Sequence, residues 1–578
     1  MRASYPAVSW YTTKMDAAKL TRLIDAAEGR SACDLVVRDV RYLDVFTCTW
    51  QNGDLAIKDG FIVGLEPGLA ARRTLEGRGR SVVPGFCDAH VHVESSLLTP
   101  HHFQRAVLAR GTTSAICDPH ELANVVGLSG IRYFLDAASD MALDLRVMLS
   151  SCVPATTFET NGGGTIDAEA LMTLMDHPKT LGLAEMMNVP GVLHADPAVL
   201  AKLSAFAGRR IDGHCPLVRG RDLSAYAAAG ISSCHESSEL GEAKEKLTKG
   251  IAVWIREGSV AKDLRALAPL LTMATSTSIG FCTDDRNPLD IAREGHIDHL
   301  VRGAIGYGVP AEVAYRAASF SVARHYGLTR RGAIAPGHVA DLVFLDDVDT
   351  CAVSDVLVAG TPVSELDLEA SGARRAQENG VARETIRANV PDVHDLEGPA
   401  GRVHVIGARE GRILTDRAVM AHDAEGVAHL TVLERYGHGS KPANAYVRGF
   451  GRNLRGAIAS SVGHDSHNLI VVGRDPADMR VALAALIESG GGFCVASERT
   501  VRAHLALPIG GLMSPEDPIF IARALGHLHD ASKAIGCELP EPFLQLAFLS
   551  LPVIPSLKLT DRGLMDVDAF QLIDVRAA

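Results

Sequence analysis

Short apolar runs alternate with Ala- and Leu-rich helical stretches over about 240 residues that follow Pro84. This alternation is typical of βαβ units built around a parallel sheet. Eight runs predict strands within residues 81–92, 112–121, 145–154, 180–187, 210–216, 231–237, 251–259 and 278–285. Eight βα units are what a (β/α)8 TIM-type barrel requires, so the fold class is α/β, and such barrels carry their chemistry at the C-terminal ends of the strands.

The residues before the barrel follow other patterns. Residues 16–27 have the apolar spacing of an amphipathic helix, with one face formed by Leu20, Leu23 and Ile24. Residues 33–66 are rich in β-branched side chains. They predict short antiparallel strands with turns at Asn52-Gly53 and Asp59-Gly60.

The strand-and-turn pattern returns after the barrel, at residues 330–348. We therefore predict that the barrel is inserted into a small β-sandwich domain closed by both flanking segments. A charged stretch at residues 368–385 predicts a solvated helix and linker before a region of mixed strands and helices. The predicted parts are an N-terminal helical segment (1–30), a composite β-domain (31–83 with 329–365), the catalytic barrel (84–328), a linker (366–399) and a C-terminal α+β domain (400–578).

The composition excludes several classes of protein. An apolar fraction of 47% over 578 residues supports a large buried core and excludes a disordered chain. The balance of 57 basic against 69 acidic residues argues against nucleic acid or an anionic membrane as a partner. The 11 cysteines include no CxxC pair, and no signal-peptide or membrane-spanning pattern occurs, so we expect reduced thiols and a cytoplasmic location.

Two histidines, His90 and His92, stand one residue apart at the end of the first predicted barrel strand. Residues i and i+2 of a strand point to the same face, so both imidazoles would enter the barrel mouth as half of a metal site. A bare HxH is most often a pair of ordinary polar residues on a half-exposed strand. The metal interpretation is favoured because later predicted strands also end in metal-binding side chains: Glu185, His214, His235 and Asp284.

This set, with "PGFCDAHVH" at its head and "GAIAPGHVADLVFLD" at its tail, resembles the amidohydrolase superfamily. The segments "HVHVESS", "DPHE" and "GHDSHN" are similar to those of the bacterial adenine deaminases. The resemblance implies two divalent ions per subunit, with Mn²⁺ favoured and Fe²⁺ or Zn²⁺ as alternatives. It assigns His90, His92 and Asp284 to the more buried ion and His214 and His235 to the second. Glu185 would bridge the two ions, where many relatives carry a carboxylated lysine.

The implied reaction is the hydrolytic deamination of adenine to hypoxanthine and ammonia, with metal-activated hydroxide attacking C6. Asp284 would accept the water proton and pass it to the departing ammonia, and an acid at a ring nitrogen would take up developing charge. Glu121 and Glu239 are both candidates for that acid, and the sequence does not choose between them. Catalytic roles are thus predicted for Asp284, Glu185 and Glu121. Substrate contacts are predicted for His120, Glu121, Ser238, Glu239 and Arg256.

Other interpretations of the sequence stay open. The same metal cradle would serve the deamination of another base or the hydrolysis of a cyclic amide, and a barrel that had lost catalysis would act as a scaffold. In the C-terminal region, His464 and His467 would form either another metal site or a polar loop against the barrel mouth or a neighbouring subunit. A homo-oligomer is expected, with a dimer favoured.

Overall fold

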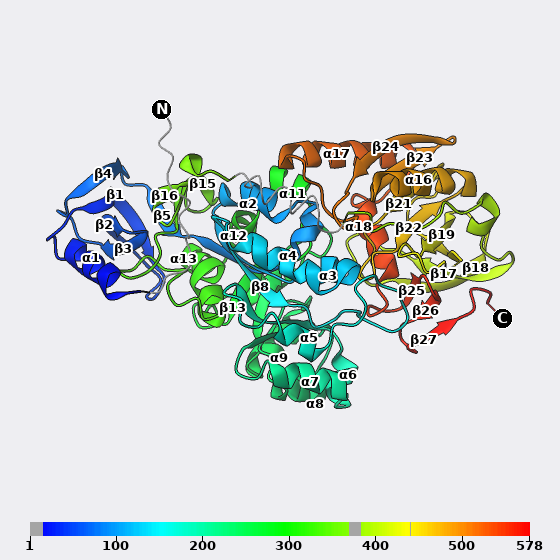
Figure 1. Cartoon of the computed structure of the whole chain (residues 1–578), viewed down its shortest axis with the longest axis horizontal. Coiled ribbons are helices and arrows are strands. Elements are labelled where there is room, and N and C mark those ends of the chain that lie inside the picture. The colour runs from blue at the N-terminus through cyan, green and yellow to red at the C-terminus, as the bar shows by residue number, and fades with distance from the viewer. Residues whose placement is uncertain (1–14, 369–382, 440, 578) are drawn as a thin grey trace.

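The structure, a computed structural model, describes residues 15–368, 383–439 and 441–577. Eight parallel strands form a barrel at the centre of the molecule (Figure 1). They are β6 (Phe86–Val91), β7 (Thr112–Cys117), β8 (Asp144–Leu149), β9 (Thr180–Met186), β10 (Arg210–Gly213), β11 (Ser233–Cys234), β12 (Ala252–Arg256) and β13 (Ile279–Cys282). Seven of the eight predicted runs contain one of these strands and the third overlaps β8, which begins one residue before it, so the predicted barrel is confirmed.

The first strand, β6, and the last strand, β13, approach each other and nearly close the barrel. Val91 and Asp284 form an isolated parallel bridge, and the N–H of Asp284 donates to the carbonyl oxygen of His90 at 3.0 Å. Every residue of β6, β7, β12 and β13 is buried, as expected for parallel strands covered by helices. The helices of this part are α2 (Pro100–Leu108), α3 (His120–Val126), α4 (Leu128–Ala138), α5 (Ala168–Met172), α6 (Val189–Leu193), α7 (Pro197–Ala205), α8 (Gly220–Ala228), α9 (Leu240–Thr248), α10 (Leu264–Leu267), α11 (Pro288–Arg293), α12 (Ile297–Gly306), α13 (Ala311–Arg316) and α14 (Val322–His325).

The segments before and after the barrel share one eight-stranded sheet, at the left of Figure 1. Strand β5 pairs antiparallel with β14, with Val83 opposite Val343. This pairing joins residues that the barrel separates in the sequence. The strands are β1 (Cys33–Asp44), β2 (Thr49–Lys58), β3 (Phe61–Gly64), β4 (Ala71–Glu76), β5 (Ser81–Pro84), β14 (Leu342–Asp347), β15 (Ala352–Val358) and β16 (Thr361–Pro362).

Two local predictions for this part need correction. Helix α1 (Ala17–Ala27) forms, but of its predicted apolar face only Leu23 is buried, while Leu20 is 41% and Ile24 54% exposed. Asp59-Gly60 does form the turn between β2 and β3, whereas Asn52-Gly53 lies within β2, opposite β1. A Cβ on Gly53 would lie 2.4 Å from the carbonyl oxygen of Leu65, so close backbone packing requires this glycine.

The C-terminal part packs on the barrel, at the right of Figure 1. One cluster of buried apolar residues contains Phe103 and Leu122 of the barrel helices together with Met513 and Ile521. This part comprises an eight-stranded sheet, a three-stranded sheet and three helices: β17 (Arg402–Gly407), β18 (Asp416–Ala421), β19 (Val427–Leu433), β20 (Ala443–Arg448), β21 (Ala457–Ser460), β22 (Leu469–Gly473), β23 (Gly492–Ser497), β24 (Thr500–Ala506), β25 (Leu557–Thr560), β26 (Gly563–Asp566), β27 (Gln571–Ile573), α16 (Pro476–Ser489), α17 (Pro518–Ala534) and α18 (Pro542–Ala547).

Most of the predicted charged helix at residues 368–385 lies outside the described residues. Among the helices that are described, none has both the length and the apolar character needed to cross a lipid bilayer.

Candidate functional site

The C-terminal ends of five barrel strands bring together the six side chains that the sequence predicts as metal ligands. His90 belongs to β6 and Glu185 to β9, and the others follow their strands by one or two residues. All six are buried, with no more than 8% of any one of them exposed. The set consists of His90, His92, Glu185, His214, His235 and Asp284.

Four of these side chains meet around the end of β6. Nε2 of His90 and Nε2 of His92 lie 3.1 Å apart. Oδ1 of Asp284 is 3.5 Å from the first nitrogen and 3.2 Å from the second. Oε1 of Glu185 is 3.4 Å from Nε2 of His92. Two imidazoles and two carboxylates therefore face one point at the barrel mouth.

Glu185 also connects this group to the other two histidines. Its Oε2 lies 2.8 Å from Nδ1 of His214 and 3.4 Å from Nε2 of His235. The ring of His235 stacks on that of His90, with centroids 4.0 Å apart, so His235 borders both groups. Ligand atoms within 4.8 Å of one another accordingly include both the set His90, His235, Asp284 and the set Glu185, His214, His235.

The hydrogen bonds around His92 show that this donor set fits a cation. Nδ1 of His92 lies 3.0 Å from the main-chain oxygen of Asp118. Because a carbonyl oxygen can only accept, Nδ1 carries the proton and Nε2 presents a lone pair to the centre of the site. Lone pairs of imidazole and carboxylate groups that converge on one buried point are the donor set of first-row divalent metals, and the hydrogen bond from Nδ1 fixes the orientation of the ring.

Two carboxylates and one imidazole have pKa shifts that favour binding of a cation, whereas the neighbouring carboxylates Glu185, Glu236 and Asp284 raise the pKa values of His92, His214 and His235. Burial, with the charge of His235 adding to it, lowers the pKa of His90 to about 4 and so favours the neutral imidazole that a metal needs. Burial alone would raise the pKa of Asp284. Its contacts with His90 and His92 outweigh that effect and hold this pKa well below the usual range. Glu185 behaves in the same way, held mainly by His214 and His235, so both carboxylates are charged.

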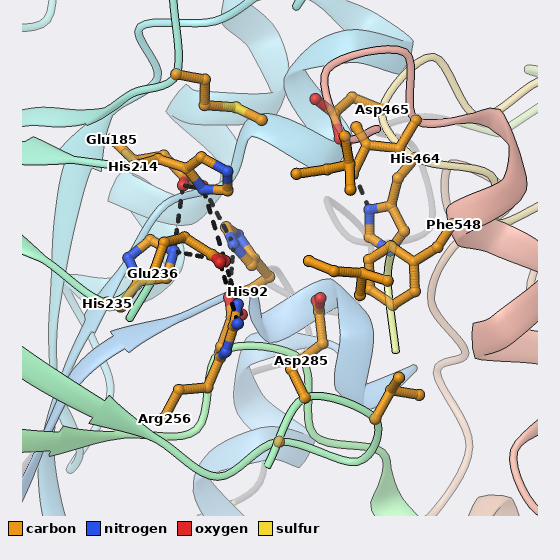
Figure 2. Close-up of a pocket in the computed structure, with 18 of the residues that line it drawn as sticks. His92, Glu185, His214, His235, Glu236, Arg256, Asp285, His464, Asp465 and Phe548 are labelled. Atoms are coloured by element: carbon orange, nitrogen blue, oxygen red, sulfur yellow. Dashed lines mark hydrogen bonds and ion pairs between the residues drawn. The ribbon is translucent and has the colours of Figure 1, made fainter. Parts of the chain in front are cut away.

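Beside this centre lies a cavity with two chemically different walls (Figure 2). His214, His235, Glu236 and Arg256 stand on one side of it. His464, Asp465 and Phe548, all from the C-terminal part, stand on the other. Apolar side chains complete the lining: Met187, Val260, Ile413, Leu551 and Ile554.

Three of the five predicted substrate contacts line this cavity. His120, Glu121 and Arg256 are all buried, and Nδ1 of His120 lies 3.0 Å from Oδ2 of Asp118. Ser238 and Glu239 do not join them. Both are exposed, and Glu239 precedes helix α9 with its carboxylate 3.8 Å from Arg219.

The structure adds cavity residues that the sequence analysis missed, above all Glu236. Its two oxygens pair with the guanidinium of Arg256, with Nη2 3.0 Å from Oε2. Its Oε1 also lies 3.7 Å from Nε2 of His235. The signal was present, since Glu236 directly follows His235 in "CHES". Asp465 lies within the polar segment "GHDSHN", whereas Phe548 had no comparable signal.

Comparison with known proteins gives consistent matches along the chain. The amidohydrolase family model matches residues 81–363, and the model of the adenine deaminase C-terminal domain matches residues 408–571. Adenine deaminases from Methylobacterium sp. (strain 4-46) and Methylobacterium nodulans are 52% and 51% identical to this chain, and the alignments cover 96% of it and 99% and 100% of those proteins. Among solved structures, a triazine hydrolase variant covers 60% of this chain and 98% of its own at 18% identity and a TM-score of 0.45, too distant to inform the chemistry.

Proposed function

Because this chain belongs to the adenine deaminase family of the amidohydrolase superfamily, we propose that it hydrolyses adenine to hypoxanthine and ammonia. The observation that carries the proposal is the meeting of four histidines and two carboxylates at the barrel mouth, beside a cavity that Glu236 and Arg256 also line. Relatives that share half of their residues along nearly the whole chain bear the name of this activity.

His90, His92 and Asp284 would hold one divalent ion and His214 and His235 a second, with Glu185 shared between them. We propose Mn²⁺ as the ion, with Fe²⁺ or Zn²⁺ as the alternatives for the same donor atoms. Ions bound there would supply Lewis acidity and lower the pKa of a bound water toward neutrality.

The side chains around the centre transfer the proton, orient the carboxylate that carries it and bind the amino group of the substrate. Asp284, charged and buried, accepts the proton of the attacking water and delivers it to the amine that leaves C6. Arg256 lies 3.0 Å from Oδ2 of Asp284 and orients that carboxylate. Glu236, paired with the same guanidinium, presents a second carboxylate to the cavity, where the amino group of adenine would find an acceptor.

Ammonia release from adenine, adenosine, cytosine and a dihydropyrimidine tests the substrate. We expect turnover of adenine, loss of that activity after treatment with a chelator, and its return when Mn²⁺ is added. Ammonia from adenosine alone would reject the free base, and turnover of the dihydropyrimidine alone would indicate cyclic amide hydrolysis. A stable, metal-free and inactive protein would indicate a scaffold.

Matched variants distinguish the effect of losing the proposed metal ligands from the effect of the same substitution at an exposed histidine. His90→Asn with His92→Asn should bind less metal and lose activity that Mn²⁺ does not restore. His394→Asn makes the same change at a side chain that is 76% exposed and should behave as wild type. We also propose a homo-oligomer, with a dimer favoured, which light scattering of the purified protein would test.

A further inference from the structure

A loop of the C-terminal part forms the wall of the cavity opposite the metal ligands. This loop joins β21 to β22 and carries His464, Asp465 and His467, all of them buried. Both main-chain polar groups of His464 form hydrogen bonds. Its N–H donates to the carbonyl oxygen of Ala547 at 3.2 Å, and its carbonyl oxygen accepts from Oγ of Ser550 at 3.2 Å. The position of the imidazole is therefore fixed by the fold.

Both histidines of the loop contact the carboxylate of Glu121, which comes from the barrel. Nδ1 of His464 lies 2.8 Å from Oε1, and Nε2 of His467 contacts Oε2. Nδ1 of His467 accepts from the N–H of Gly463 at 3.3 Å, so in the neutral ring the proton is on Nε2 and faces Glu121. Burial lowers the pKa of His467, which favours that neutral ring.

These contacts change the role that the sequence suggested for Glu121. Burial alone would raise its pKa, but the charge of His464 and the hydrogen bonds from His464 and His467 hold that pKa well below the usual range. Glu121 is thus a carboxylate with no proton to give. A carboxylate that faces one nitrogen of an imidazole orients the ring and stabilises its protonated form, as in the Ser-His-Asp triad.

The other nitrogen of His464 is free to act. Its Nε2 is buried and has no hydrogen-bond partner among the residues that the structure describes, and the ring lines the cavity. The ring also stacks on Phe548, with centroids 4.8 Å apart and an angle of 11° between the planes. In Figure 2, His464 and Phe548 face the metal ligands across the cavity. A buried donor without a partner is costly unless a ligand satisfies it.

We propose that His464 contacts the substrate directly and donates a hydrogen bond from Nε2 to N1 of the purine, with Glu121 and His467 as positioning residues. This inference rests on the proposed deamination of adenine. Attack at C6 places negative charge on the adjacent ring nitrogen, and a preorganised donor there stabilises that charge. The C-terminal part would thereby supply one catalytic residue to an active site otherwise built by the barrel.

Two substitutions at His464 separate its two nitrogens. Asparagine places an amide close to the position of Nδ1, so His464→Asn keeps a partner for Glu121 and removes the donor to the substrate. Glutamine places its amide close to the position of Nε2, so His464→Gln keeps the donor and loses Glu121. We expect His464→Asn to lower kcat/KM for adenine by about 100- to 1000-fold, and His464→Gln to recover at least tenfold of that loss.

The positioning role of His467 has its own test. His467→Gln keeps a donor toward Glu121 and should stay within about tenfold of wild-type kcat, whereas His467→Ala should lose about 100-fold, because Glu121 would no longer be held. All four variants should keep the wild-type metal content. His394→Asn, an exposed histidine far along the chain from this loop, is the control.

If the variants do not fold, inhibition of the wild-type enzyme by substrate analogues tests the same contact between His464 and N1. 1-Deazaadenine lacks N1, whereas 3-deazaadenine retains it. We expect 1-deazaadenine to inhibit at least tenfold more weakly. Equal inhibition by the two analogues, or a folded His464→Asn within threefold of wild-type kcat/KM, would overturn the inference. An enzyme that releases no ammonia from adenine at all would instead reject the proposed function.

Discussion

Removing the positive charge of Arg256 should destabilise the metal-free protein, and divalent cations should restore much of the loss. Its guanidinium contacts Oε1 of Glu236 and lies 3.0 Å from Oδ2 of Asp284 and 3.3 Å from Oδ2 of Asp263. The side chain is only 7% exposed, so Arg256→Met leaves these carboxylates buried together without the charge of the guanidinium. Breaking a buried ion pair in this way costs about 3–5 kcal/mol.

The assay is thermal unfolding of wild type and Arg256→Met after dialysis against a chelator, then with Mn²⁺. One kcal/mol shifts the Tm of a domain of barrel size by about 2–4 °C, so we expect a drop of about 6–20 °C without metal. The rise in Tm on adding Mn²⁺ should be larger in the variant, because the remaining carboxylates attract the cation more strongly. Arg256→Lys should fall in between, since lysine cannot pair with both oxygens of Glu236. The exposed Arg221→Met is the control. A metal-free Arg256→Met that melts within about 2 °C of wild type would refute the reasoning.

Two further predictions concern residues near the cavity and the barrel edge. Burial, with Asp290 adding to it, raises the pKa of Glu541 to about 8, so its ionisation opposes folding increasingly as pH rises from the unfolded value of about 4.3. Glu541→Gln should therefore raise Tm by calorimetry at pH 8 more than at pH 5, and an equal effect at both values would contradict this. Buried Lys558 donates from Nζ to the carbonyl oxygens of Ile413 and Phe548, both at 2.8 Å, and so holds two residues of the apolar wall. Lys558→Met should raise KM for adenine several-fold with little change in metal content, and an unchanged KM in a folded variant would exclude that role.

The sequence predicts which side chains meet at the barrel mouth, because the barrel geometry does most of the positioning. Once eight strands are assigned, their C-terminal ends all border the same mouth, however far apart the strands are in the chain. His90 and Asp284 show this: they come from the first and last strands and meet where the barrel closes. The alternation of side chains between the two faces of a strand, by contrast, does not predict the directions of the residues that follow β11. That strand has only two residues, so His235 and Glu236 are not held to opposite faces, and both reach the cavity.

The wall supplied by the C-terminal part could not be derived from local pattern. The contact between Glu121 and His464 joins residues more than half the chain apart, and no periodicity specifies how the C-terminal sheet docks on the barrel. "GHDSHN" did mark a polar loop, and packing against the barrel mouth was one of three interpretations it allowed, beside another metal site and packing against a neighbouring subunit. Ser238 and Glu239 lie outside the cavity, because they belong to the exposed segment that leads into α9, where the chain leaves the mouth.

The barrel and the C-terminal part share one apolar core, and this limits how the role of the C-terminal part can be tested. Leu122 of the barrel packs in one apolar cluster with Met513 and Ile521, and Arg105 pairs with Asp517 at 2.8 Å. Expression of residues 1–365 alone would expose that cluster to water, and large exposed apolar patches favour aggregation. We therefore predict that the truncated barrel is insoluble when its yield is compared with that of the full chain. A soluble, metal-loaded barrel would show that the cluster is dispensable. Since insolubility removes activity whatever the site requires, substitutions within the intact chain are what separate the chemistry of His464 from the support that its surroundings give.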